Sequence, residues 1–434
     1  MESALVYGAP PLSTGVEHPS YPHARAPRPV TKGSVHLDAL RGGAALLVFM
    51  NHTRALYFSS IIDQPTPGAT VSIGIDPVAH PATATAKIPF VQADPLAGHG
   101  IKLASEAVVI FFVLSGYLVG GSTLRAMRLR NWSWKNYLIK RMTRLWVPLI
   151  PCLLLCVFLD RTGYRFFGEA SIYHNPPGIG LVTATDLVHR LGVTTVLGNI
   201  FFLQNIRVWY LGTDVSLWSL ANEFWYYMIF PCLALAFTAG RSILLRVLYL
   251  VLAAAMLVFI TPSVAILFPV WVLGAVVAIL PKPLSSPRAG LLSLVGLPVL
   301  FFCMIKARLL FLPMVVVESL IGLLASAFLY LLVQQREMTG RSLYRSLAGY
   351  FSQISYTLYI VHVPLAIFLA SSINSPWHRW SKTPAHLALF LILDGMVLAC
   401  ATLLWRLFEA NTDSIRLRLF ERRPAIAGNP VALP

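Results

Sequence analysis

Long apolar blocks separated by short polar stretches dominate the pattern along this chain. The blocks hold about 17 to 24 residues with few charges, and about 20 apolar residues of helix are needed to cross the ~30 Å hydrocarbon core of a bilayer. A membrane β-barrel would instead show weakly alternating segments of about ten residues. The pattern therefore predicts an all-α, polytopic integral membrane protein whose helices surround a central cavity.

The apolar blocks predict ten membrane-spanning helices, at 42–60, 101–121, 144–160, 216–238, 243–261, 264–280, 289–305, 312–334, 352–372 and 385–408. A further apolar stretch, 191–203, contains two glycines and runs into the polar step Gln204-Asn205. The glycines and the polar end predict an interfacial or re-entrant segment rather than a span. If the stretch crosses the membrane, the topology that follows changes.

The ends of the chain are polar or basic. We predict a disordered tail over 1–36, a membrane domain over 37–410 and a basic tail over 411–434. Residues 1–36 have no apolar core followed by a small-residue cleavage site, so no secretory signal peptide is expected.

Composition and charge agree with a membrane protein. Hydrophobic residues make up 56% of the chain and charged residues 12%, against about 25% charged in ordinary soluble domains. The net charge of +16 does not predict nucleic-acid binding, because the charge has no compact soluble module to sit on. With ten spans, the loops on the side of the two termini carry 23 of the 34 lysines and arginines. Membrane lipid is an expected partner of the protein. The positive-inside rule then places both termini in the cytoplasm, with the protein in the cell (inner or plasma) membrane.

The cysteines predict neither a metal site nor a disulfide scaffold. All five fall in or beside apolar spans, without metal-ligand spacing, and are expected to be small core residues: Cys152, Cys156, Cys232, Cys303 and Cys400.

Two ionisable residues on the first predicted span are candidates for chemistry. Arg41 and His52 are eleven residues apart, which returns both to one helix face about 16 Å apart along the axis. A neutral imidazole is the side chain best suited to take a proton from a hydroxyl at neutral pH. We predict a catalytic role for both; the alternatives are a packing role for His52 and an interfacial anchor at Arg41.

Two arginines stand where the third predicted span begins. Arg141 and Arg144 are three residues apart and so face the same way. Paired guanidinium donors suit phosphate oxygens, and a cytoplasmic nucleotide thioester would supply them. Lipid headgroups are the alternative partners.

The fourth predicted span carries Glu223 about 10 Å from the non-cytoplasmic side, a depth that approaches His52 from the opposite direction. A carboxylate beside a histidine can fix its tautomer and stabilise the imidazolium, so we predict that Glu223 orients His52. A structural ion pair with a buried arginine is the alternative. Trp218, one turn earlier, is a candidate to line the substrate cavity, with helix packing as its alternative.

The ninth predicted span places Tyr356, Tyr359 and His362 at steps of three, so Tyr359 and His362 are candidates to line the same cavity. Pro364 offers the alternative that a kink frees a carbonyl for His362 and gives it a structural role. In the second span, the small residues of FFVLSGYLVGG predict close helix packing. A nucleophilic role for Ser115 has no supporting context.

Six motifs together resemble the acyltransferase type three family of membrane O-acyltransferases, over about 37–410: LDALRGGAALLVFMNH, FFVLSGYLVGG, KRMTR, LWSLANEFWYYMIFP, SYTLYIVHVP and WRLFE. By this resemblance Arg41 and His52 match the paired Arg and His of the family, and the KRMTR arginines match its Arg-x-x-Arg. Glu223 matches the Trp-Ser-Leu-x-x-Glu glutamate. Phe224 stands where many members have a second acid, so the role of that acid does not carry over.

The resemblance implies transfer of an acyl group, with acetyl favoured, from cytoplasmic acyl-CoA to a hydroxyl of a carbohydrate or cell-surface polysaccharide precursor. His52 would deprotonate the hydroxyl or carry the acyl group itself. Some members have a fused extracytoplasmic esterase-like domain, so a separate extracytoplasmic acyl-transfer partner is expected here. The alternatives are acylation of a secreted small molecule such as a macrolide, or transport without chemistry, since carriers also hold intramembrane histidines and acids. The lack of an internal repeat argues against a carrier.

Overall fold

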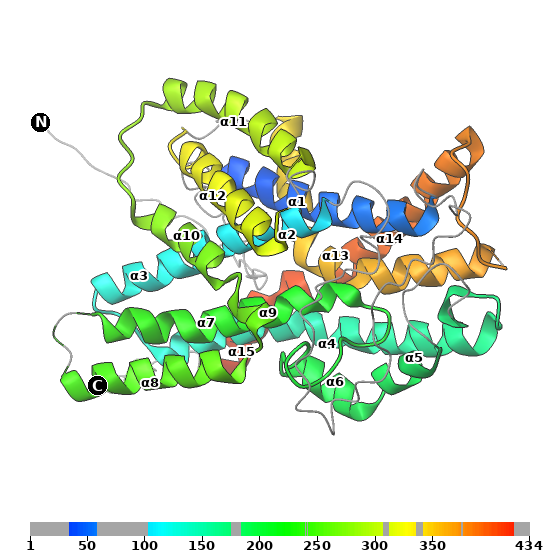
Figure 1. Cartoon of the computed structure of the whole chain (residues 1–434), viewed down its shortest axis with the longest axis horizontal. Helices are drawn as coiled ribbons and strands as arrows, with labels where there is room; N and C mark the ends of the chain where they lie inside the picture. Colours follow the sequence, from blue (N-terminus) through cyan, green and yellow to red (C-terminus); the bar gives the residue numbers. More distant parts are fainter. Residues whose placement is uncertain are drawn as a thin grey trace, which may run out of the picture. The chain divides into compact units, whose positions relative to one another are not determined.

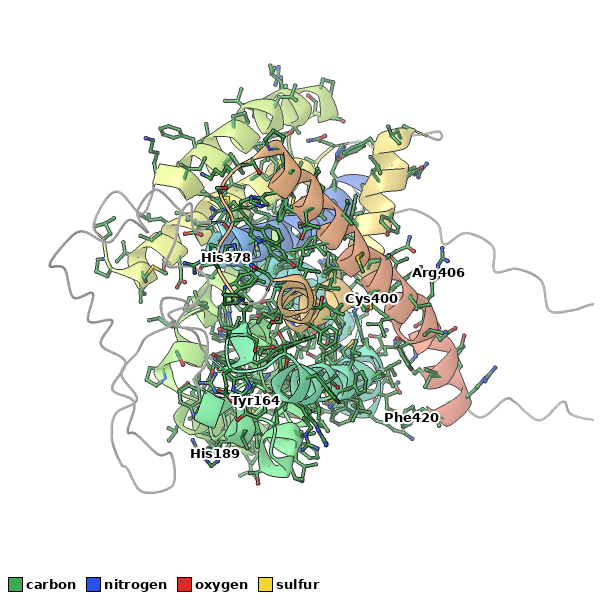
Figure 2. All side chains as sticks on the ribbon, turned by 90° about the vertical axis from the view of Figure 1, so that its right-hand side faces the viewer. Tyr164, His189, His378, Cys400, Arg406 and Phe420 are labelled. Atoms are coloured by element: carbon green, nitrogen blue, oxygen red, sulfur yellow. The ribbon has the colours of Figure 1, made fainter. Side chains whose placement is uncertain are left out.

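The computed structural model describes residues 34–58, 103–174, 184–238, 240, 242–306, 312–335, 342–374 and 376–420. These residues form helices joined by turns and loops, and no β-strand occurs among them (Figure 1). Most of the two predicted tails lies outside the described residues. The described part of the C-terminal tail forms the helix α15 (Thr412–Phe420), which the short η7 (Glu409–Asn411) connects to the last long helix. Figure 2 shows this end of the chain from Arg406 to Phe420.

Each predicted span falls on a helix. The long helices are α1 (Ser34–Tyr57), α4 (Trp134–Phe166), α7 (Trp218–Ala236), α8 (Ile243–Phe259), α10 (Phe268–Ile279), α11 (Ser286–Lys306), α12 (Met314–Leu332), α13 (Leu343–Ile373) and α14 (Pro384–Leu407). The second span consists of α2 (Ala104–Ser115), the π-helical turn η3 (Gly116–Gly120) and α3 (Gly121–Arg128). Short helices fill the connections: η4 (Ile172–His174), α5 (Ala184–Arg190), α6 (Val193–Ile200), η5 (Val215–Leu217) and α9 (Pro262–Ala265).

Seven helical segments in the described part of the chain are long and apolar enough to cross a membrane. They contain α2–α3, α4, α9–α10, α11, α12, α13 and α14–α15. These helices confirm an all-α membrane protein. The count of ten remains a prediction, because α1, α7 and α8 are not among the seven; α8 is a shorter apolar helix of 17 residues.

The stretch 191–203 forms no spanning helix. Its helical part, α6, has eight residues, which rise about 12 Å and cannot cross ~30 Å of hydrocarbon. The indole of Trp146 on α4 donates a hydrogen bond to the Ile200 carbonyl at 2.9 Å, and Asn199 donates to the Trp209 carbonyl at 2.9 Å. These contacts satisfy the carbonyl at the end of α6 and a carbonyl in the loop that follows. The interfacial or re-entrant placement of the segment remains a prediction.

Helices α1 and α13 lie side by side and run in the same direction. His36 contacts Tyr344 near their starts, and Tyr57 donates to the Ala366 carbonyl at 3.1 Å near the other end. Two parallel membrane helices need an odd number of crossings between them, which the first and ninth predicted spans satisfy.

A glycine sets the spacing of this helix pair. A Cβ atom at Gly42 would lie 2.7 Å from the Cβ of Phe351 and 2.9 Å from the backbone nitrogen of Ser352. Gly43, the next residue, has nothing within 4 Å of such an atom. Of these two glycines, Gly42 is the one at which the close approach of α13 leaves no room for a side chain.

The glycines of the second predicted span have the packing role expected of them. A Cβ at Gly116 would collide with the carbonyl of Trp271 on α10, and one at Gly274 would collide with the carbonyl of Val113. Reciprocal close approach of this kind is how small residues bring membrane helices together.

Candidate functional site

The two histidines predicted for the cavity contact one another directly. Nδ1 of His52 on α1 lies 2.8 Å from Nε2 of His362 on α13. The ring planes differ by 8°, with centroids 5.1 Å apart. The two residues are 6% and 0% exposed, so the pair is shielded from solvent.

His362 is also bonded to its own helix. Its Nδ1 lies 3.1 Å from the carbonyl oxygen of Leu358 and 2.9 Å from that of Tyr359. Pro364 would free the carbonyl of Ile360, four residues before it, which is neither of these two. The alternative of a proline-freed carbonyl therefore does not explain the contacts of His362.

A narrow gap lies beside the histidine pair, between α1 and α13. Besides the two histidines it is lined by Thr53, Leu56, Val363 and Ala366, and it is too small to hold a water molecule. Any acyl group that reaches the pair on this side meets closely packed side chains.

A buried carboxyl group that the sequence analysis missed stands behind this gap. Asp394 on α14 is 6% exposed and accepts a hydrogen bond from the Thr53 hydroxyl at 3.1 Å. The available signal was an acidic residue inside the tenth predicted span, where ionisable groups are costly.

Glu223 on α7 is held by hydroxyl groups from two helices. Its Oε1 accepts a hydrogen bond from Ser115 at 2.9 Å and another from the hydroxyl of Tyr227. The Trp271 indole in turn donates to the Ser115 oxygen at 3.1 Å. Ser115 therefore has a polar role beside the packing role predicted for its motif, and it lies at the start of the π-helical turn, a feature often found at functional sites.

The partner on Nδ1 of His52 is His362, whereas Glu223 was predicted to orient that ring. Glu223 lies within electrostatic range of Arg41. Phe224, at the position of the second acid of the family, stacks on Phe202 with centroids 4.5 Å apart and planes at 11°. That position therefore belongs to an aromatic contact and not to the polar cluster around Glu223.

Arg41 joins a cluster of charges at the other end of α1. It is half-buried and lies within electrostatic range of the exposed Arg144 on α4 and of Glu409 in η7. Glu409 accepts hydrogen bonds from the backbone nitrogen of Thr357 at 3.3 Å and from its hydroxyl at 2.6 Å. The WRLFE motif carries Glu409, but nothing in the motif indicates that it lies near Arg41.

Arg141 is fixed between aromatic rings. Its guanidinium carbon lies 5.6 Å from the ring centre of Tyr137 and 5.7 Å from that of Tyr227, and Nη2 donates to Ser122 at 3.3 Å. Its Nε is buried and has no hydrogen-bond partner among the described residues. The guanidinium thus contacts the tyrosine that holds Glu223.

The other two predicted cavity residues are Tyr359 and Trp218, and Tyr359 is the one that lies beside the histidines. The hydroxyl of Tyr359 lies 2.7 Å from Ser219, and its ring centre is 5.9 Å from that of His362. Trp218 meets Phe112 edge-on at 6.3 Å, which is the packing contact that stood as its alternative.

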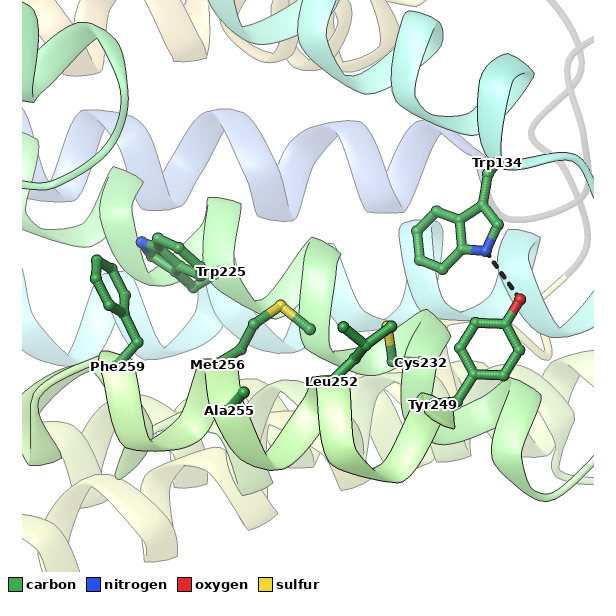
Figure 3. Close-up of a pocket in the computed structure, with 8 residues that line it drawn as sticks. All are labelled: Trp134, Trp225, Cys232, Tyr249, Leu252, Ala255, Met256 and Phe259. Carbon is green, nitrogen blue, oxygen red and sulfur yellow. Dashed lines mark hydrogen bonds between the residues drawn. The ribbon is translucent and has the colours of Figure 1, made fainter. Parts of the chain in front are cut away.

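A larger apolar cavity lies elsewhere, between the start of α4 and helices α7 and α8 (Figure 3). Its volume is about 490 Å³, and a hydrogen bond across it joins the Trp134 indole to the Tyr249 hydroxyl at 3.3 Å. It contains none of the residues predicted for chemistry. All five cysteines are unpaired, and no group of His, Cys, Asp and Glu in the described ranges is arranged to hold a metal ion.

Comparisons with known proteins agree with the motifs. Residues 35–406 match the family described as acyltransferase domain. An O-acetyl transferase of Shigella phage Sf6 is 29% identical over 129 residues, which are 28% of this chain and 32% of the phage protein. The chain thus aligns with about a third of that relative. No solved structure matches it.

Proposed function

Because the chain belongs to the acyltransferase domain family, we propose that it transfers an acetyl group from acetyl-CoA to a hydroxyl group of a carbohydrate at the cell surface. The observation that carries the proposal is the buried pair of His52 and His362, which places a base between closely packed helices. An intramembrane ionisable pair is costly and marks a functional site by default.

The arginines support a phosphate-bearing donor. Arg41 lies near Arg144. Arg41 and His52 share one unbroken helix and are about 16 Å apart along it. A donor that uses both sites needs phosphates at one end and a reactive carbonyl at the other. A coenzyme A thioester has that form, and with both termini in the cytoplasm the arginines would meet the cytoplasmic pool.

The chemistry needs only the lone pair of His52. In direct transfer, Nε2 takes the proton of the acceptor hydroxyl while the hydroxyl oxygen attacks the thioester carbonyl. The carbon–sulfur bond then breaks, and the imidazolium returns the proton to the leaving thiolate. In the two-step route, Nε2 attacks the carbonyl, the carbon–sulfur bond breaks with release of the coenzyme A thiolate, and an acyl-histidine forms. The hydroxyl oxygen then attacks the acyl group, the bond to Nε2 breaks, and the hydroxyl proton neutralises the thiolate. Both routes give an ester and free coenzyme A.

One observation favours a short acyl group. The phage relative is named an O-acetyl transferase. A membrane enzyme that delivers acetyl groups toward the cell surface also fits a separate extracytoplasmic partner that completes the transfer.

Radiolabelled acetyl transfer by the purified protein in lipid nanodiscs tests the proposal. Acetyl-CoA is the donor, and glycans extracted from the host envelope are the acceptor. His52→Ala should lower the rate by about 10²–10⁴-fold, the usual contribution of a positioned base. His378→Ala, which changes an exposed loop histidine (Figure 2), is the control and should keep the rate. A His52→Ala protein with the wild-type rate would refute the role of His52. Transport of acetyl-CoA into reconstituted lipid vesicles, without labelled glycan, would identify a carrier.

A further inference from the structure

The hydrogen bonds around the histidine pair admit one assignment of protons when both rings are neutral. Carbonyl oxygens only accept, so Nδ1 of His362, which faces the Leu358 and Tyr359 carbonyls, carries a hydrogen. A neutral imidazole has a single N–H, so Nε2 of His362 has a lone pair. It must accept from Nδ1 of His52 across the 2.8 Å contact. His52 therefore holds its own lone pair on Nε2.

From this chain of bonds we infer that His362 is a positioning residue: it fixes His52 in the tautomer whose Nε2 is the base. The inference rests on the proposed acyl transfer and names the residue that prepares its base. His362 takes the place that an aspartate occupies in a serine-protease triad, where the partner on Nδ1 sets tautomer and ring orientation.

The anchor of His362 is itself held from outside α13. The Tyr359 carbonyl that receives the Nδ1 hydrogen also lies 3.0 Å from the hydroxyl of Ser216, in the turn η5 before α7. The side chain of the same tyrosine bonds Ser219 on α7. The entrance to α7 thus fixes the carbonyl that orients His362, and Phe49 on α1 closes the other side of the ring edge-on at 6.1 Å.

The pair also responds to charge in a defined way. When Nε2 of His52 takes the hydroxyl proton, the imidazolium still donates from Nδ1 to His362, which stabilises the cation formed during transfer. A proton on Nε2 of His362 would instead turn that nitrogen into a donor. His52 would then have to accept at Nδ1 and carry its hydrogen on Nε2, where it could no longer act as a base.

Two substitutions separate this role from simple packing. His362→Gln can place an amide oxygen near the position of Nε2 and still accept from His52. His362→Phe keeps a flat ring and removes the acceptor. We expect His362→Phe to lower kcat by about 10²–10⁴-fold, at most the loss of about 10⁴-fold that follows replacement of a triad aspartate by asparagine. The KM for acetyl-CoA should stay within about threefold, and His362→Gln should recover at least about tenfold of the loss.

Solid-state ¹⁵N NMR of protein labelled at histidine gives a readout that does not depend on activity. The signals of His52, identified by their loss in His52→Ala, should show protonated Nδ1 and unprotonated Nε2 in the wild-type protein. In His362→Phe they should move toward the tautomer protonated at Nε2.

The inference is overturned by an Nε2-protonated His52 in the wild-type protein, or by a folded His362→Phe protein with the wild-type kcat. A His362→Phe protein that does not fold leaves the wild-type spectrum and the Gln variant to decide. Wild-type protein without any acetyl transfer would refute the proposed function, while the spectrum would still test the pair.

Discussion

Replacing Gly42 by alanine tests whether the spacing of α1 and α13 sets the geometry of the histidine pair. The added Cβ would meet the Cβ and backbone carbon of Phe351 and the backbone nitrogen of Ser352 at 2.7–2.9 Å. Two of these three atoms belong to the helix backbone, which cannot turn aside as a side chain can. The helices must therefore separate at this level.

The size of the effect follows from the contact distances. Ordinary contact begins near 3.5 Å, so the backbones must part by about 0.6–0.8 Å. Overpacking of this kind costs roughly 1–3 kcal/mol, while alanine in place of glycine within a helix returns roughly 1 kcal/mol. His52 is ten residues further along α1, about 15 Å away, and its bond to His362 at 2.8 Å weakens rapidly with added distance. A misplacement of about 1 Å can cost about 10²-fold in rate.

Gly43→Ala is a closely matched control, because the same methyl group enters the same helix with nothing within 4 Å. Thermal unfolding in detergent and acetyl transfer in nanodiscs should be measured for both variants. Gly42→Ala should unfold at a lower temperature than Gly43→Ala and lose roughly tenfold to 10²-fold of the rate. Equal stability and equal rate in the two variants would refute the argument that close approach at Gly42 fixes the site.

Two further changes test the donor site and the loop before α7. Arg144→Gln should raise the KM for acetyl-CoA about tenfold, which corresponds to about 1.4 kcal/mol of lost binding. The KM for an acetyl thioester without phosphates should not change. Equal effects on the KM of both donors, measured from initial rates, would contradict a phosphate contact. Burial raises the pKa of the Asp214 carboxyl well above its ordinary value near 3.8, so the stability it contributes is present at low pH and is lost as the pH rises through its folded pKa. Asp214→Asn removes that dependence, so its unfolding temperature should rise relative to the wild type with increasing pH, whereas a constant difference would show that Asp214 does not titrate in this way.

The helices were predictable because their signal is local. A run of about 20 apolar residues specifies a membrane helix whatever surrounds it. Every predicted span lies on a helix. The stretch 191–203 was also predictable, since its glycines and the polar step after it shorten the apolar run. By contrast, α1 and α7 fall outside the seven apolar segments. On α1 this follows from the polar side chains, among them Arg41 and His52, that give the helix its chemistry.

The partners of the site residues were not predictable, because one sequence does not say which helices touch. His52 and His362 each stood out as costly residues, but 310 positions separate them. Helical periodicity gave Glu223 a depth near His52 and left its direction around the helix open. The structure directs it toward Ser115 and Tyr227. Glu409 follows an apolar helix directly, and nothing local distinguishes such an acid from an ordinary helix end.

The parallel pairing of α1 and α13 makes the distance between the arginine cluster and the base a fixed property of the protein. Asp38 accepts a hydrogen bond from Ser352 at 2.7 Å on the arginine side, and Tyr57 bonds the Ala366 carbonyl beyond the histidines. Neither helix can slide along the other without breaking both contacts and the bond between His52 and His362. A donor is therefore selected by length as well as by charge. Arg41 and His52 are about 16 Å apart along α1, so acetyl phosphate is too short to bridge them, whereas an extended thioester reaches both ends.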